Sequence, residues 1–107
     1  MDNRLKRRSD FDLVFKKGKR CYARSLLLVY VKARDYLKVG YSVSKKNGKA
    51  VMRNTIKRRL RAAVRPHLES LGNYYIVLVP KVAESYDFHK FEADLKFLIE
   101  KEGLLNA

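Results

Sequence analysis

A run of basic side chains holds most of the binding chemistry that this sequence offers. Residues 45–65 carry nine Lys and Arg and no Asp or Glu. Like charges three or four residues apart destabilise a helix by ~0.2–0.5 kcal/mol per pair, so a merely solvated helix usually alternates them with acids. We therefore expect a polyanion, with nucleic acid favoured, to neutralise this charge. The candidate binding residues are Lys45, Lys46, Arg53, Asn54, Lys57, Arg58, Arg61 and Arg65.

Residues that could cleave a phosphodiester are not clustered in the same way. Such chemistry usually needs grouped carboxylates for metal ions or a positioned pair of histidines. The first 65 residues contain only four acids, and the only histidines are His67 and His89, which we expect to be structural or solvent-facing. A single cysteine, Cys21, offers neither a disulfide nor a Cys/His metal site, and we expect it to be buried in a cytoplasmic protein. The sequence thus predicts no catalytic residue and no metal ligand.

The net charge is divided unevenly along the chain. Residues 1–65 hold 21 Lys and Arg against 4 Asp and Glu, a net +17, whereas residues 66–107 hold 4 against 7, a net −3. This asymmetry is typical of an electrostatic binding surface. A length of 107 residues with 47% hydrophobic content predicts a single domain with one core over residues 1–107, and its basic charge makes nucleic acid the expected ligand. No apolar run approaches the ~20 residues of a membrane span, and neither a membrane nor an obligate protein partner is evident.

Apolar spacing predicts the element that carries the basic run. Apolar residues recur every three or four positions, as in an amphipathic helix with a basic arc beside an apolar stripe. Arg59 lies at the edge of the stripe and is expected to extend outward along its own methylenes. Pro66 removes a helical hydrogen bond, so we predict a kink there. The stripe consists of Met52, Ile56, Leu60, Ala63, Val64, His67, Leu68 and Leu71.

The remaining elements are predicted from periodicity and from turn residues. A first helix is expected to begin with Ser9 as its N-cap and to end at Gly18, and a last helix to end at Gly103. Strands are expected at 25–31, 37–44 and 74–79. The order helix-strand-strand-helix-strand-helix predicts an α/β fold, an α+β sandwich in which a mixed sheet with one parallel pair is covered by helices on one face.

Two features of these elements bear on binding. In the strand at 37–44, small and hydroxyl side chains alternate with apolar ones, so one face leaves the backbone open to an overlying chain or a polynucleotide. In the first helix, Phe11, Val14 and Phe15 lie at i, i+3 and i+4. This spacing alone favours core positions for both aromatics, and stacking on unpaired bases is the alternative.

Several of these residues together resemble the protein subunit of bacterial ribonuclease P over essentially the whole chain. The similarity begins with Leu5 and Lys6 ahead of Phe11 and Phe15, and continues with Gly18. Its most specific part is the segment Gly-Tyr-Ser-Val-Ser-Lys-Lys at 40–46, followed by Gly-Lys-Ala-Val-Met-Arg-Asn at 48–54 and Ile-Lys-Arg at 56–58.

The resemblance implies a fold and a division of labour. It implies a single domain of a kind shared with some ribosomal proteins, with a left-handed strand-helix-strand crossover that contravenes the general right-handed rule. It implies that the basic helix holds the catalytic RNA, and that a cleft between the first helix and the sheet receives the 5′ leader of precursor tRNA. It also implies that the RNA performs the cleavage and binds most of the Mg²⁺, with no organic cofactor. The leader-cleft candidates are Lys6, Arg7, Phe11, Phe15 and Lys16.

The sequence departs from the family pattern at two positions and leaves a third undecided. Thr55 stands where the family motif Arg-Asn-Arg has its second arginine, so we expect one RNA contact fewer. Pro66 is not part of the family pattern. The aromatic that the family places on the cleft side of the first strand corresponds to Val29 or Tyr30, which point to opposite faces, and the sequence leaves the choice open.

The function that fits best is the protein component of a ribonucleoprotein that matures the 5′ end of tRNA. The alternative is a ribosomal or other structural RNA-binding protein, and the identity of the copurifying RNA would separate the two. A DNA-binding module is disfavoured, because a groove reader concentrates its contacts in a short recognition patch, whereas here the charge extends from the N-terminal arm through the basic helix.

Overall fold

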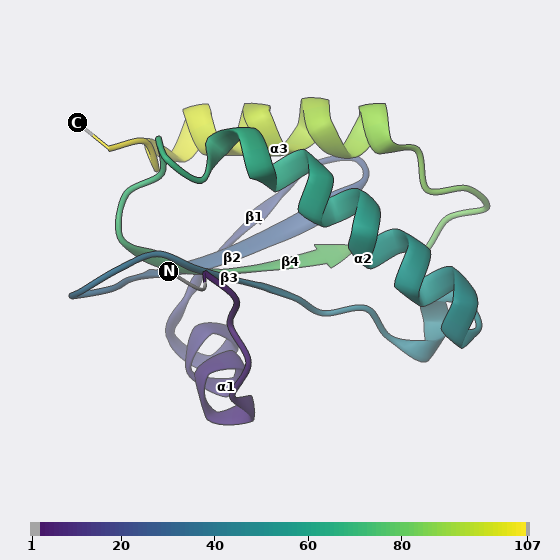
Figure 1. Cartoon of the computed structure of the whole chain (residues 1–107), viewed down its shortest axis with the longest axis horizontal. Helices are drawn as coiled ribbons and strands as arrows, with labels where there is room; N and C mark the ends of the chain where they lie inside the picture. The colour runs from purple at the N-terminus through teal and green to yellow at the C-terminus, as the bar shows by residue number, and fades with distance from the viewer. Residues whose placement is uncertain (1–2, 107) are drawn as a thin grey trace.

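A four-stranded mixed sheet separates two helical layers (Figure 1). The computed structural model describes residues 3–106. The strand order is β1-β2-β4-β3, with β1/β2 and β2/β4 antiparallel and β3/β4 parallel. Two 3₁₀ turns, at Lys45–Asn47 and Arg65–His67, flank the second helix. The elements are α1 (Arg8–Lys17), β1 (Lys19–Tyr22), β2 (Leu26–Lys32), β3 (Lys38–Tyr41), α2 (Ala50–Val64), β4 (Tyr74–Pro80) and α3 (Phe88–Glu102).

The predicted β3-α2-β4 unit is confirmed, whereas β1 was not predicted. This strand has four residues, of which only Cys21 is buried, so it shows no run of alternating apolar side chains. Cys21 is only 5% exposed, as expected. With β1 included, the sheet has one more antiparallel pair than predicted.

The expectation that all helices cover one face was wrong. α2 and α3 pack on one face of the sheet, whereas α1 lies against the other (Figure 1). The central strands β2 and β4 are apolar on both sides: Leu28 and Leu78 face α2 and α3, and Val29 and Val77 face α1, all with 0% exposure. A strand buried on both faces has a continuous apolar sequence, which indicates burial without indicating what covers each face.

α1 ends where predicted but begins differently. Arg7, not Ser9, occupies the N-cap position, and it forms no side-chain capping bond. Gly18 ends the helix with φ −77°, and its N–H donates to the Val14 carbonyl at 2.7 Å. A Cβ on Gly18 would lie 2.3 Å from that carbonyl oxygen and 2.8 Å from Cγ1 of Val29. Glycine is therefore required by close packing, since this backbone conformation is open to any residue.

α2 stops earlier than a kinked helix would. Its α-helical part ends at Val64, and the residues around Pro66 form a 3₁₀ turn instead of a bent continuation. Of the predicted stripe, Ile56 and Leu60 are fully buried, whereas Met52 is 43% exposed. The first turn of α2 extends beyond the end of the sheet (Figure 1). Met52 lies beside Gly48 of the preceding turn, where a Cβ on the glycine would be 3.2 Å from the Met52 side chain.

Candidate nucleic-acid interface

α2 presents its basic arc away from the core. The fully buried Ile56 and Leu60 fix the orientation of the helix on the sheet, and the cationic side chains then lie on the outward sides. Within residues 3–106, none of these side chains forms an ion pair with a carboxylate. The basic arc comprises Arg53 and Lys57, which are half-buried, and Asn54, Arg58, Arg61 and Arg65, which are exposed.

Arg61 is positioned by an aromatic ring. Its guanidinium carbon lies 5.6 Å from the ring centroid of Tyr41, in cation-π geometry. Burial raises the pKa of Tyr41 to about 12, although the positive charges of Arg61 and Arg65 act in the opposite direction. Tyr41 therefore stays neutral at physiological pH. The contact orients Arg61 without neutralising it, which leaves its charge available to an anion.

A buried asparagine holds the turn that carries Lys45 and Lys46. The Asn47 side chain is 4% exposed, and its Oδ1 accepts a hydrogen bond from the Ser44 N–H at 3.1 Å. Its Nδ2 donates to the hydroxyl of Tyr86 at 3.2 Å, across 39 residues of sequence. The turn is thereby fixed to the loop before α3, with both lysines exposed. No local signal in the sequence indicates this role for Asn47, because its partner lies far along the chain.

Three further residues of α2 have specific surroundings. Thr55 Oγ1 donates to the Val51 carbonyl at 3.0 Å, so it is bonded within its own helix and presents no charge. Arg59 does not simply extend outward: its Nη1 donates to the Tyr86 carbonyl at 2.7 Å and ties α2 to the loop before α3. Arg53 Nε is buried and has no hydrogen-bond partner among the described residues.

On the other side of the sheet, α1 crosses the middle of what we call the α1 face. The α1 face consists of the β2 and β4 side chains that point toward α1: Leu27, Val29, Val31, Tyr75, Val77 and Val79. Val14 of α1 is fully buried with Val29 and Val77 at the centre of this face. Leu27 pairs with Val79 on one side of that centre, and Val31 pairs with Tyr75 on the other. These outer pairs are only half-buried, as are Phe11 and Phe15. The α1 face thus combines a rigid centre with partly exposed apolar margins.

The approachable face of β3 is occupied by α1. A Cβ on Gly40 would lie 2.6 Å from Cζ of Phe11, so the glycine makes room for that ring. The sequence predicted either an overlying chain or a polynucleotide on this face, and at Gly40 the structure shows the overlying chain. Phe11 therefore has a packing role, whereas Phe15 has no such close contact with a glycine.

The N-terminal arm extends the edge of the sheet. The Leu5 N–H donates to the Val39 carbonyl at 2.9 Å, and the Val39 N–H donates to the Asn3 carbonyl at 2.7 Å. This pairing places Lys6 and Arg7 between β3 and the start of α1, with exposed side chains. Lys16 is also exposed, in the last turn of α1. The five leader-cleft candidates therefore all belong to the α1 layer. This layer is separated by the sheet from the basic arc of α2.

The structure settles which residue of β2 faces α1. Val29 points toward α1 and is 0% exposed, whereas Tyr30 points to the opposite side and donates its hydroxyl to Glu102 at 3.0 Å. Of the two residues that the sequence left open, the one that faces α1 is thus the buried valine. Tyr75 on β4 is a partly exposed aromatic of the same layer, like Phe11 and Phe15 on α1, and it was not among the predicted site residues.

Metal-ligating side chains do not gather among the described residues. Residues 3–106 contain no group of three or more His, Cys, Asp or Glu that could hold a metal ion. In the same part of the chain, no helix has the length and apolarity needed to cross a membrane. His67 is half-buried, and the exposed His89 lies 3.8 Å from a carboxylate oxygen of Glu92.

Comparison with known proteins identifies the family. The profile of the ribonuclease P family matches residues 1–103. The ribonuclease P protein component of Streptococcus agalactiae serotype Ia is 35% identical over 104 residues, covering 95% of each chain, and that of Bacillus velezensis is 38% identical over 105 residues, covering 95% of this chain and 90% of the relative.

Solved structures show the same fold. The ribonuclease P protein of Staphylococcus aureus superposes with a TM-score of 0.87 at 27% identity, covering 99% of this chain and 100% of the other. The Thermotoga maritima protein, in complex with 1-(4-fluorophenyl)-2-thiourea, gives a TM-score of 0.81 at 31% identity, covering 92% and 98%. The chain therefore belongs to the family of bacterial ribonuclease P protein components, the protein subunits of a tRNA-processing endoribonuclease that also contains RNA.

Proposed function

We propose that the two layers of the protein bind different RNAs: the basic arc of α2 binds the catalytic RNA, and the α1 face binds the 5′ leader of precursor tRNA. The observation that carries this proposal is the unpaired charge of α2. Arg58, Arg61 and Arg65 are exposed, and no carboxylate of the described residues lies within ion-pair distance of them. Such an arc suits a phosphate backbone, whose binding is dominated by Lys and Arg contacts.

The α1 face has a different chemistry, which suits an unpaired strand. Its margins expose aromatic and aliphatic side chains, including Phe15 and Tyr75, and the same layer carries the exposed cations Lys6, Arg7 and Lys16. Unpaired bases stack on aromatic rings while basic groups hold the backbone. A leader that is single-stranded matches this combination, whereas a folded RNA helix would mainly require phosphate contacts.

The chemical step is assigned to the RNA partner. The protein supplies positioning and charge neutralisation, and the net +17 of residues 1–65 reduces repulsion between the catalytic RNA and the precursor tRNA. In this proposal Mg²⁺ is bound mainly by RNA, no organic cofactor takes part, and the complex acts in the cytoplasm. No observation favours the alternative of a ribosomal or other structural RNA-binding protein.

The experiment is to identify the RNA that copurifies with a tagged copy expressed in its own host at moderate salt. The proposal expects a processing RNA that cleaves precursor tRNA, and a variant in which Lys57, Arg58 and Arg61 are all alanine should recover much less of it. Recovery of ribosomal RNA in place of a processing RNA would contradict the proposal.

A further inference from the structure

Tyr22 on the edge strand β1 points to the same side of the sheet as α1. Side chains alternate along a strand, and its neighbour Cys21 is buried on the opposite side, toward α2 and α3. In the register of the sheet Tyr22 pairs with Leu27, and Leu27 pairs with Val79. Tyr22, Leu27 and Val79 thus form one row across β1, β2 and β4, which we call the outer row. It borders the buried centre of the α1 face.

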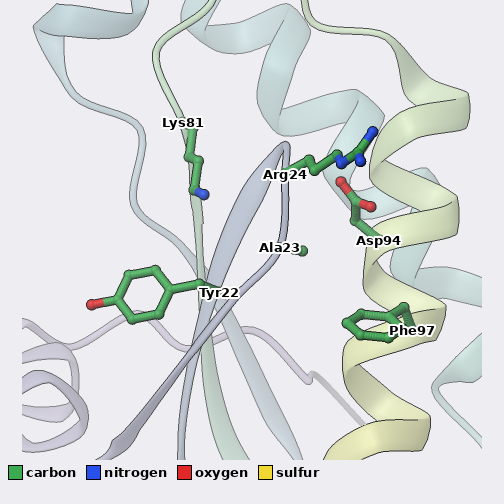
Figure 2. Close-up of a pocket in the computed structure, with 6 residues that line it drawn as sticks. All are labelled: Tyr22, Ala23, Arg24, Lys81, Asp94 and Phe97. Carbon is green, nitrogen blue, oxygen red and sulfur yellow. The ribbon is translucent and has the colours of Figure 1, made fainter.

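The end of this row is open and positively charged. Tyr22 is 61% exposed, and Nζ of Lys81 lies 5.9 Å from the centroid of its ring. Figure 2 shows the Tyr22 ring and Lys81 on one side of the β1–β2 hairpin, with Phe97 of α3 on the other. Single exposed aromatics are ordinary on protein surfaces. Here, however, the ring continues an apolar row and has a cation beside it. The ring can stack on a base and the cation can contact a phosphate, so together they can hold one nucleotide.

The segments next to Tyr22 and Lys81 are held in place by hydrogen bonds. The Lys81 N–H donates to the Ser25 carbonyl at 3.0 Å. Ser25 in turn donates from its N–H and its hydroxyl to Asp94 Oδ2, at 2.8 and 2.6 Å. The turn after β1 and the residue after β4 are therefore fixed to each other and to α3. About two of the roughly four acceptor positions of the nearby Asp94 carboxylate are engaged in this way, which reduces its repulsion of a phosphate.

We propose that Tyr22 and Lys81 form an additional nucleotide position for the 5′ leader, in which the Tyr22 ring stacks on an unpaired base and the Lys81 ammonium contacts an adjacent phosphate. This inference rests on the proposed function, because it extends the leader surface from α1 along the outer row to the sheet edge. The leader is favoured over the catalytic RNA, since Tyr22 faces the α1 side whereas the basic arc lies on α2, across the sheet.

The test uses the holoenzyme, reconstituted from the catalytic RNA and full-length protein, with precursor tRNAs whose leaders are lengthened one nucleotide at a time. With the wild-type protein, affinity should rise in a step at the length at which a nucleotide reaches Tyr22. Tyr22→Ala should remove this step, about a 5- to 150-fold loss, as for one stacked base. Tyr22→Phe should retain it, because the ring is kept. Lys81→Ala should reduce the step and lower its salt dependence.

Phe97→Ala is the matched control. Phe97 is 53% exposed and has Nζ of Lys101 at 5.8 Å from its ring centroid, so it resembles Tyr22 in exposure and in its cation. It lines the same pocket as Tyr22 and Lys81, but from α3 on the other side of the β1–β2 hairpin, and it does not continue the outer row (Figure 2). This variant should bind every leader as the wild type does. Thermal unfolding of each variant checks that the fold is retained.

Two results would overturn the inference. If folded Tyr22→Ala binds all leader lengths like the wild type, Tyr22 contacts no leader base. If instead it loses affinity equally for mature tRNA, or for the catalytic RNA alone, the ring serves another RNA contact. Leader-dependent binding by Phe15→Ala, measured in parallel, reports on the proposed leader role of the α1 face separately, so the two can fail independently.

Discussion

Phe11 and Gly40 form the contact that joins α1 to the edge of the sheet: the ring lies where a Cβ on Gly40 would be 2.6 Å from Phe11 Cζ. Gly40→Ala should therefore displace the ring and destabilise the protein by about 1–3 kcal/mol, the usual cost of overpacking. Denaturant unfolding measures this. In a Phe11→Leu background the same substitution should cost less, because the clashing atoms are gone. An equal cost in both backgrounds would place the strain elsewhere.

Phe15 tests the proposed leader role of α1. Phe15→Ala should weaken binding of precursor tRNA with a leader by ~1–3 kcal/mol, the value of one stacked base, and should affect mature tRNA less. Stability should fall only modestly, because Phe15 is already partly exposed. The control is Val14→Ala on the same helix, which removes a fully buried side chain and should cost about 2 kcal/mol or more of folding free energy. Equal losses of affinity for both tRNAs, or failure of the Phe15 variant to fold, would return Phe15 to the core.

The basic arc of α2 predicts a change in salt dependence. With Lys57, Arg58 and Arg61 all replaced by Ala, binding to the catalytic RNA should weaken. The slope of log affinity against log salt should flatten by roughly 0.7–0.9 for each phosphate that the variant no longer neutralises. Folding should survive, because these side chains lie outside the apolar stripe.

A variant with the same loss of charge on α3 serves as the control. Lys90, Lys96 and Lys101 are exposed, and their joint replacement by Ala should change the slope much less. If the α2 variant is folded and its slope and affinity are unchanged, α2 does not face the RNA.

An ion pair between β1 and α3 predicts a dependence of stability on pH. The Lys19 ammonium lies 2.8 Å from a Glu102 carboxylate oxygen, whose side chain is 8% exposed, and the Tyr30 hydroxyl donates to the same oxygen. The hydrogen bond from Lys19, with that from Tyr30, lowers the pKa of Glu102 from its ordinary value of 4.5, although burial opposes this. The resulting stabilisation is present above pH 4.5 and is lost as the pH falls through the lowered pKa.

Urea unfolding of the wild type and of Glu102→Gln, compared from neutral to acidic pH, measures this effect. The difference in unfolding free energy should stay constant near neutral pH and shrink below about pH 4.5. Glu100→Gln is the control, because Glu100 is exposed on the same helix. A difference that does not change with pH would mean that Glu102 has an unshifted pKa.

How much the sequence could predict depended on the range of each interaction. The β3-α2-β4 unit and α3 were predictable, because helical periodicity and turn residues such as Gly103 are local signals. β1 was not predictable, since a single buried residue, Cys21, cannot show the alternation of buried and exposed side chains that indicates a strand. The position of α1 was not predictable either. Val29 and Val77 are as apolar as their neighbours, so the apolar sequence of β2 and β4 indicates that both faces are buried without indicating which helix covers each face.

For the candidate interface, too, only features that depend on residues close in sequence could be predicted. The basic arc was readable from charge and spacing within one helix. The anchoring of Lys45 and Lys46 was not, because it depends on the hydrogen bond from Asn47 to the distant Tyr86. Whether Val29 or Tyr30 faces α1 required the register of β2 in the sheet, which only the tertiary structure defines.

The central claim, that this protein assists catalysis by RNA, is tested most directly by a cleavage assay on precursor tRNA across a Mg²⁺ series. The assay compares rigorously RNA-free protein, the catalytic RNA alone and the two together. The protein alone should be inert, and adding it to the RNA should lower the Mg²⁺ concentration needed for cleavage and tighten substrate binding, since its charge reduces repulsion between the RNAs. Cleavage by the protein alone, abolished by substituting one of its own acidic residues, would contradict the claim.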